Sequence, residues 1–314
     1  FSYNKNKEHL KKSVLDDLTV IAEAYGGQVY QYLEMSKRRA QDFSTDGHIR
    51  AEMKRFAFGD KGASRRLGEY MAGEKLVLDQ TLARIAVVSL DGRIIASTDR
   101  NYAGADVSTE PFFMAGTKGP FIAEQDLGGA SGIIIAVPIL ERDKGGRTIG
   151  ALVNFVRLSG LTSLLKGEFN RDLGGIPGSK GRRETMEVYI VNRDRLRITE
   201  PAFVKGPVLN AMVNTLPVDE CLRGAKEVAA FYGNYRGVEV AGASMCLPNL
   251  QWALVAEADS AEVLAPIDEM FRDALIGGLV SAALIGAFFV FLYRVVIRRL
   301  VTIVSATSRI AEGG

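Results

Sequence analysis

Histidine, the side chain that acid–base and metal chemistry most often uses, is rare in this sequence. The two histidines, His9 and His48, lie far apart in a segment with a helical pattern. A Ser–His–Asp triad or a histidine-based metal site needs imidazoles that converge, so neither is expected. The Gly-x-Ser-x-Gly and His-Glu-x-x-His patterns of hydrolases and metalloproteases are also missing. We expect no catalysis, cofactor or metal here, and keep a membrane-anchored extracytoplasmic enzyme as the alternative class.

One glycine-rich stretch, "LGGIPGSKGRR" (173–183), contains the residue types of a phosphate-binding loop. A P-loop requires Gly-Lys followed by Ser or Thr, whereas the order here is Gly-Ser-Lys-Gly. No strand leads into the stretch in the required way. We therefore interpret it as a basic linker between two domains.

Cys221 and Cys246 are the two cysteines of the chain. In an oxidising compartment they can form a disulfide, and closing a loop of about 26 residues would contribute roughly 3 kcal/mol. The alternative is two buried free thiols. The sequence leaves both open.

The longest apolar run, "ALIGGLVSAALIGAFFVFLY", occupies 274–293 and contains no charged residue. Twenty residues at a rise of 1.5 Å cover about 30 Å, the thickness of the hydrocarbon core of a bilayer. A buried core helix is the alternative, but such a helix normally has a polar face. We predict a transmembrane helix over 274–293.

The flanking charges orient this helix. The preceding segment is acidic, with Arg272 as its nearest cation, and the following segment begins with Arg294, Arg298 and Arg299. Because positive residues mark the cytoplasmic side, 1–273 should lie outside the cytoplasm and 294–314 inside, at a bacterial inner membrane. A net charge of +2 and this location both argue against a nucleic-acid partner. The opening "FSYNKNKEHLKK" is consistent with a first membrane segment that ends at Phe1.

A long N-terminal helix is predicted over 1–58. Its apolar seam recurs every three or four residues, at Leu10, Val14, Leu18, Ile21, Tyr25, Gln28, Tyr32 and Met35. The seam favours packing along a second copy of the chain, and packing on its own domain is the alternative.

Two similar sheet units follow the helix. Within 59–168, apolar runs flank Asp91-Gly92, a hairpin signal, and further strands are expected at 120–126, 132–140 and 148–156. Within 169–273 the pattern of strand, polar turn, strand and three more strands repeats. The predicted fold class is α+β: a long helix, two tandem antiparallel units and a transmembrane helix.

These patterns resemble the double Cache sensor domains of bacterial receptors, which contain two tandem PAS-like units. The resemblance rests on four stretches: "VVSLDGRIIAST", "STEPFFMAGTKGPFIAEQD", "GIIIAVPILERDKGGRTIGALVNFVRLSGLTSLL" and "FYGNYRGVEVAGASMCLPNLQWALVAEAD". Within the segment 294–314, the stretch "RRLVTIVSATSRIAEGG" (298–314) resembles the first helix of a HAMP relay module, with a seven-residue rhythm.

The resemblance makes 59–168 the membrane-distal unit and 169–273 the membrane-proximal unit. It implies a ligand pocket in the distal unit, between its sheet and a short helix. In the amino-acid-binding branch of the family, an arginine precedes an aromatic pair, and an acidic residue follows the last strand. Here those positions hold Glu110 and Arg157, so both charges are inverted, and a tyrosine is replaced by Phe121. The inversion allows a ligand in a reversed pose, or a Glu110–Arg157 pair beside an uncharged ligand. The expected ligand-binding residues are Glu110, Phe112, Phe113, Phe121, Glu124, Asp126, Ser131 and Arg157.

We therefore expect the sensory and transmembrane part of a homodimeric receptor that binds a small molecule. A sensor histidine kinase is the favoured output, and a chemotaxis receptor or a nucleotide cyclase with the same input domain is the alternative. Ligand binding would then favour one arrangement of paired helices.

Overall fold

The computed structural model describes residues 2–126, 131–141, 146–167, 183–200, 203 and 212–294, with the backbone alone at 2, 3, 126, 131 and 268. Its α-helices are α1 (Ser2–Ser44), α2 (Gly47–Ala57), α3 (Gly62–Tyr70), α4 (Pro111–Gly116), α5 (Ser159–Leu165), α6 (Leu216–Gly224) and α7 (Ser260–Leu292). It also contains a short π-helix, η1 (Met71–Lys75), and the 3₁₀-helices η2 (Leu76–Leu78), η3 (Arg100–Tyr102) and η5 (Pro248–Leu250).

The strands form two antiparallel sheets. They are β1 (Leu82–Ser89), β2 (Ile94–Ser97), β3 (Phe121–Asp126), β4 (Ser131–Leu140), β5 (Thr148–Arg157), β6 (Glu187–Val191), β7 (Ala229–Gly233), β8 (Glu239–Leu247) and β9 (Trp252–Asp259). The distal sheet has the order β2-β1-β5-β4-β3, and the proximal sheet has the order β6-β9-β8-β7. The proximal order equals the distal order without the edge strand β2, with β6 in the place of β1 and β9 in the place of β5. This match confirms the α+β fold with a repeated unit.

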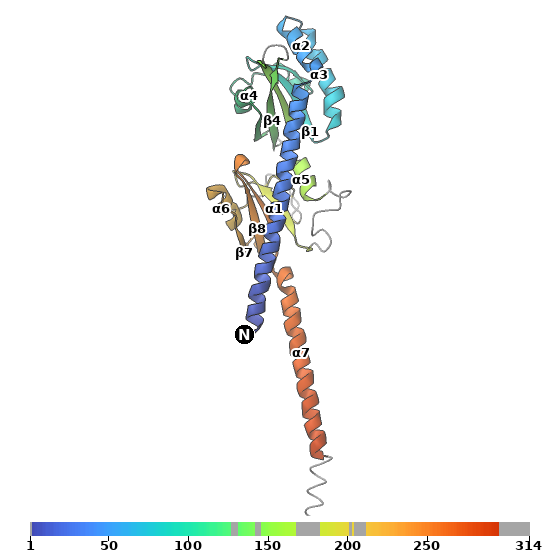
Figure 1. Cartoon of the computed structure of the whole chain (residues 1–314), viewed down its shortest axis with the longest axis vertical. Coiled ribbons are helices and arrows are strands. Elements are labelled where there is room, and N and C mark those ends of the chain that lie inside the picture. The colour runs from blue at the N-terminus through green and yellow to red at the C-terminus, as the bar shows by residue number, and fades with distance from the viewer. Residues whose placement is uncertain are drawn as a thin grey trace, which may run out of the picture. The chain divides into compact units, whose positions relative to one another are not determined.

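Helix α1 runs alongside both sheets, as Figure 1 shows. Four residues of its apolar seam, Val14, Leu18, Tyr25 and Tyr32, are buried within this one chain. Gly26 allows the close approach, since a Cβ there would collide with the Sδ of Met245 on β8. Half of the seam that was predicted to meet a second copy is therefore buried within the chain itself, while Met35 remains 59% exposed.

The expectation of one unbroken helix over 1–58 was wrong. The chain leaves α1 after Ser44 and starts α2 at Gly47, with Asp46 as the N-cap. The Asp46 carboxylate accepts hydrogen bonds from the backbone N–H groups of His48 at 2.8 Å and Ile49 at 3.2 Å. An aspartate in this position satisfies N–H groups that an unbroken helix would have used, so the break is stabilised locally.

A second regular strand was predicted after the polar turn of the proximal unit, and this prediction was also wrong. Instead of a strand, the described residues form two isolated bridges, Val191 with Arg197 and Leu196 with Met212. Arg195 sits in that turn with a positive φ of 62°. The proximal sheet therefore has no regular strand equivalent to β2 among the residues that the structure describes.

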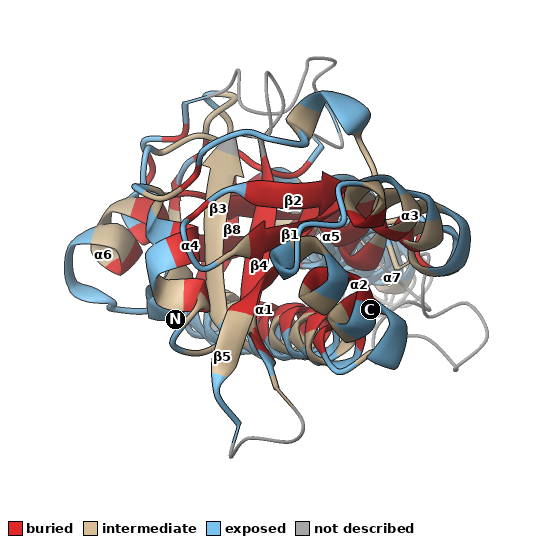
Figure 2. Cartoon of the chain, turned by 90° about the horizontal axis from the view of Figure 1, so that it is seen from above, coloured by how far each residue is buried: buried red, intermediate tan, exposed pale blue. Residues whose placement is uncertain are grey.

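Each sheet has buried apolar residues on both of its faces. In Figure 2 the buried residues concentrate on the strands and on the inward sides of the flanking helices. In the distal sheet, Ala86 and Val88 of β1 and Phe155 of β5 face the short helix α4. We call this side of the distal sheet the α4 face.

Helix α7 begins directly after β9 and includes the predicted span. It is the one described helix that is long and apolar enough to cross a membrane, with a mean hydropathy of 2.5 in its most apolar window, none of which is buried. By internal contacts, 13–260 form one compact unit, while 1–12 and 261–314 form another. The segment predicted to resemble a HAMP helix lies, after Arg294, outside the described residues.

Candidate functional site

The three phenylalanines predicted to line a pocket do come together on the α4 face. Phe112 and Phe113 of α4 are buried in one apolar cluster with Ile134 and Phe155, and the partly buried Phe121 packs against it. The ring of Phe112 meets that of Phe155 edge to face at 6.4 Å. These side chains fill the space between α4 and the sheet.

Glu110 stands at the entrance to α4. It takes the N-cap position, but its side chain makes no capping hydrogen bond. Its carboxylate instead accepts a hydrogen bond from the Nε2 of Gln125 on β3, at 3.4 Å. Glu110 is therefore held at the rim of the α4 face, half-buried beside the phenylalanine cluster.

Glu124 lies on the opposite side of β3 from Phe121, because side chains alternate along a strand. Its two carboxylate oxygens accept hydrogen bonds from the Nδ2 of Asn192 at 2.8 Å and the Nε1 of Trp252 at 3.0 Å. Both donors belong to the proximal unit. Glu124 thus connects the two sheet units and does not share a site with Glu110 and the phenylalanines. Trp252 is itself a core residue, at 1% exposure.

Arg157 is exposed at the end of β5, and its guanidinium donates hydrogen bonds to the backbone carbonyls of Gln80, at 2.9 Å, and Leu82. It fixes the segment that enters β1. The described ion pairs do not include a Glu110–Arg157 pair. Asp126 and Ser131 pair across the hairpin of β3 and β4, while their side chains lie outside the described residues.

The sequence interpretation missed the most unusual polar group of the α4 face, Arg84. It lies on β1, is only 8% exposed, and points to the same face as Ala86. Its guanidinium carbon lies 3.5 Å from the ring centroid of Tyr102 and 4.2 Å from that of Phe155. Cation–π contacts with two rings compensate part of the cost of burying the charge.

The hydrogen-bonding capacity of Arg84 is mostly unused. One nitrogen contacts the Asp99 carboxylate at 3.4 Å, and the Nε is buried without a partner among the described atoms. A guanidinium has five N–H donors, so this side chain can still bind an acceptor such as a carboxylate or carbonyl oxygen. A signal was present in the sequence: within "LARIAVVS", Arg84 is the single cation on the inward side of a predicted strand.

The corresponding face of the proximal sheet holds a buried carboxylate with neutral partners. Glu257 on β9 accepts hydrogen bonds from Tyr189 Oη at 3.0 Å, Tyr232 Oη at 2.8 Å and Asn234 Nδ2 at 2.8 Å. Burial raises the pKa of Glu257 above its usual value, and the three donors oppose that effect. Both carboxylate oxygens of Glu257 accept hydrogen bonds from protein donors, which indicates a structural role.

A buried ion pair lies next to it. Glu187 is opposite Glu257 in the register of β6 and β9, and it pairs with Arg197 at 3.0 Å. The two side chains are 2% and 3% exposed. Tyr235 donates to Glu187 at 2.6 Å, and burial followed by this hydrogen bond raises the pKa of Tyr235 to about 12. The guanidinium of Arg197 also lies 4.5 Å from the Tyr235 ring centroid.

The proximal unit is cross-linked. A disulfide joins Cys221 of α6 to Cys246 of β8, with 5.3 Å between their Cα atoms. Both residues belong to the apolar cluster between α6 and the sheet. The bridge that the sequence left open therefore ties α6 to the proximal sheet. Among the residues that the structure describes, no group of three or more potential metal ligands occurs.

Comparison with solved structures identifies the fold. The sensor domain of the histidine kinase DctB of V. cholerae superposes with a TM-score of 0.56 at 12% identity, covering 79% of this chain and 98% of that one. The periplasmic sensory domain of the Campylobacter jejuni chemoreceptor Tlp1 gives 0.52 at 13% identity, with coverage of 82% and 99%. The sensory domain of Tlp3 from the same organism, with isoleucine bound, gives 0.50 at 14%, with coverage of 82% and 97%.

No protein-family model matches the sequence, and no curated protein matches it either. The fold of the sheet-containing part is that of double Cache sensor domains, which confirms the resemblance at the level of structure. At identities this low the agreement concerns the fold alone.

Proposed function

We propose that this chain is the extracytoplasmic sensory part and membrane-crossing helix of a homodimeric bacterial receptor, with no catalysis of its own. The observation that carries the proposal is the direct connection of β9 to α7: a sensor-type fold leads, without a linker, into an unburied apolar helix. Sensor domains of a histidine kinase and of chemoreceptors share the fold. A sensor histidine kinase is our preferred output, and a chemotaxis receptor is the second candidate.

The orientation can be tested by labelling introduced cysteines. The variants Arg193→Cys, at an exposed position of the proximal unit, and Ser308→Cys, beyond α7, would be expressed in intact cells. Because arginines follow the apolar run, a membrane-impermeant maleimide should label the first variant within minutes and the second only after permeabilisation. The reverse labelling pattern would contradict the proposal.

We further propose that a small molecule binds on the α4 face of the distal unit and that Arg84 is its polar anchor. Phe112, Phe113 and Phe121 supply the apolar surface, and Glu110 contributes a second charge at the rim. This combination of apolar walls and a few polar groups is typical of small-molecule sites. Since those walls pack together here, ligand entry requires α4 and its neighbouring loop to move away from the sheet.

A thermal-shift screen of small metabolites on the whole chain in nanodiscs tests the anchor. A ligand at one hundred times its Kd stabilises the native state by about 2.7 kcal/mol, so a hit produces a clear rise in Tm. We expect Arg84→Met to lose that rise and the matched variant Arg157→Met to keep it. Loss with Arg157→Met alone would move the anchor to Arg157.

A further inference from the structure

A cavity lies away from the α4 face, at the outer edge of the distal sheet. Helix α3 runs beside the edge strand β2, and the turn η3 closes the space between them, leaving a groove of about 340 Å³. Its lining residues are Lys61, Ser64, Arg65, Gly68, Glu69, Ala72, Ala96, Ser97, Thr98, Arg100 and Ala103. We call it the α3–β2 groove.

Small residues create the space. A Cβ on Gly68 would lie 3.0 Å from the backbone oxygen of Ser97, so α3 approaches β2 as closely as a glycine permits. Ala72, Ala96 and Ala103 present only methyl groups to the groove. Ser64 fixes the two elements by donating to the Ile95 carbonyl at 2.6 Å. The floor of the groove is thus narrow, apolar and held in place.

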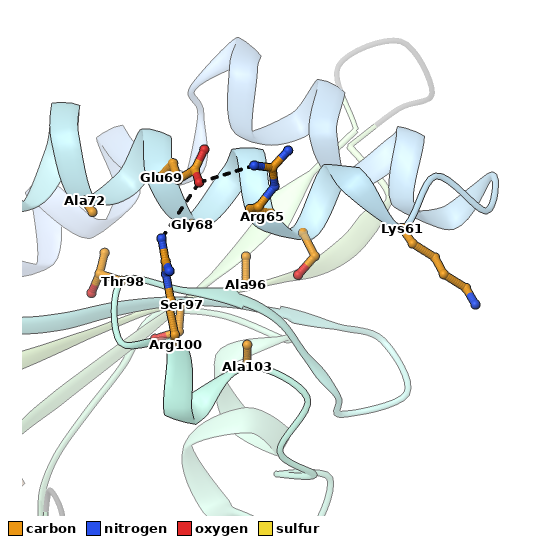
Figure 3. Close-up of a pocket in the computed structure, with 11 residues that line it drawn as sticks. Lys61, Arg65, Gly68, Glu69, Ala72, Ala96, Ser97, Thr98, Arg100 and Ala103 are labelled. Atoms are coloured by element: carbon orange, nitrogen blue, oxygen red, sulfur yellow. Dashed lines mark ion pairs between the residues drawn. The ribbon is translucent and has the colours of Figure 1, made fainter.

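The residues that line the groove carry more positive than negative charge. Lys61, Arg65 and Arg100 line it together with a single carboxylate, Glu69. Figure 3 shows Arg65 of α3 and Arg100 of η3 converging on Glu69, with Lys61 at the far end of the groove. Each guanidinium lies 3.9 Å from the same Glu69 oxygen. This distance is too long for a hydrogen bond, so the N–H donors of both arginines stay available to another acceptor.

We infer that the α3–β2 groove binds a small oxyanion, a carboxylate or a phosphate ester, separately from the ligand of the α4 face. Two arginines from different elements can bind the oxygens of such a group with paired hydrogen bonds. The volume is at the lower end of the range for small-molecule sites, and the methyl-lined floor accommodates a short apolar body. Glu69 competes with the ligand for both guanidinium groups.

This competition predicts opposite effects for two neighbouring substitutions. With the whole chain in nanodiscs of zwitterionic lipid, citrate and inorganic phosphate are titrated calorimetrically at constant low ionic strength. We expect at least one probe to bind, Arg100→Gln to weaken its binding roughly tenfold, and Glu69→Gln to strengthen it several-fold. The choice between citrate and phosphate distinguishes the two oxyanion classes.

The matched control is Arg223→Gln, which removes another exposed, ion-paired arginine from α6 and should leave the affinity unchanged. The inference is overturned if neither probe binds at millimolar concentration, if Arg223→Gln weakens binding as much as Arg100→Gln, or if Glu69→Gln fails to strengthen it.

Discussion

Replacing Arg197 by methionine should lower the free energy of unfolding of the proximal unit by about 3–5 kcal/mol. The substitution leaves the Glu187 carboxylate, which is 2% exposed, without its buried cation. Methionine retains much of the apolar volume of the arginine, so lost packing contributes little to this effect. The hydrogen bond from Tyr235 stays in place but carries no charge to offset that of Glu187.

Chemical denaturation of the whole chain in detergent, followed by the fluorescence of Trp252, measures this loss. Trp252 is the single tryptophan and is buried in the proximal unit, so its emission reports on that unit. The pair is isolated by a double-mutant cycle with Glu187→Gln and Arg197→Met. The double variant should be more stable than Arg197→Met alone. Additive losses from the two single substitutions would show that the pair is not coupled.

The sheets could be predicted from the sequence because their signals are local. Apolar runs on either side of Asp91-Gly92 predict a hairpin, and β1 and β2 form there. The break at Asp46 was also predictable in principle, since an aspartate before Gly47 is a favourable N-cap. The regular seam of α1 concealed that break.

The polar contacts of the candidate site could not be predicted in the same way. The guanidinium of Arg84 is buried against the rings of Tyr102 and Phe155. Tyr102 comes from a turn, and Phe155 comes from a strand much later in the chain. Glu124 meets Trp252 across a separation of 128 residues. A family motif that aligns Glu110 and Arg157 with ligand contacts cannot show that Arg157 is engaged with backbone carbonyls. Such pairings depend on tertiary contacts that no local pattern encodes.

The hydrogen bonds of Glu124 restrict the movement of β3 relative to the proximal sheet. The Glu124 carboxylate holds Asn192 and Trp252 with one oxygen each, so any displacement of β3 relative to the proximal sheet breaks at least one charge-assisted hydrogen bond. Strand β3 also carries Phe121 on its α4 face and pairs with β4. A ligand that shifts α4 and β3 therefore acts on the same strand that contacts the proximal unit.

The disulfide provides the second large expected effect. Cys221→Ala should lower the stability of the oxidised protein by roughly 3–4 kcal/mol, because the bridge closes a loop with a sequence separation of 25 and restricts the unfolded chain. It also releases α6 from β8, so the apolar cluster around Val218 and Val255 should loosen first. The reduced wild-type protein should already have lost this contribution.

The measurement compares melting temperatures of wild type, Cys221→Ala, Cys246→Ala and the double alanine variant, each with and without a reductant. Wild type should fall on reduction to about the level of the three variants, whose own melting temperatures should hardly change. Since a single alanine leaves one thiol, the double variant controls for intermolecular bridges. Equal losses from Cys221→Ala under oxidising and reducing conditions would mean that the two cysteines act only as packed thiols. The stabilisation by α6 would then come from the apolar cluster alone.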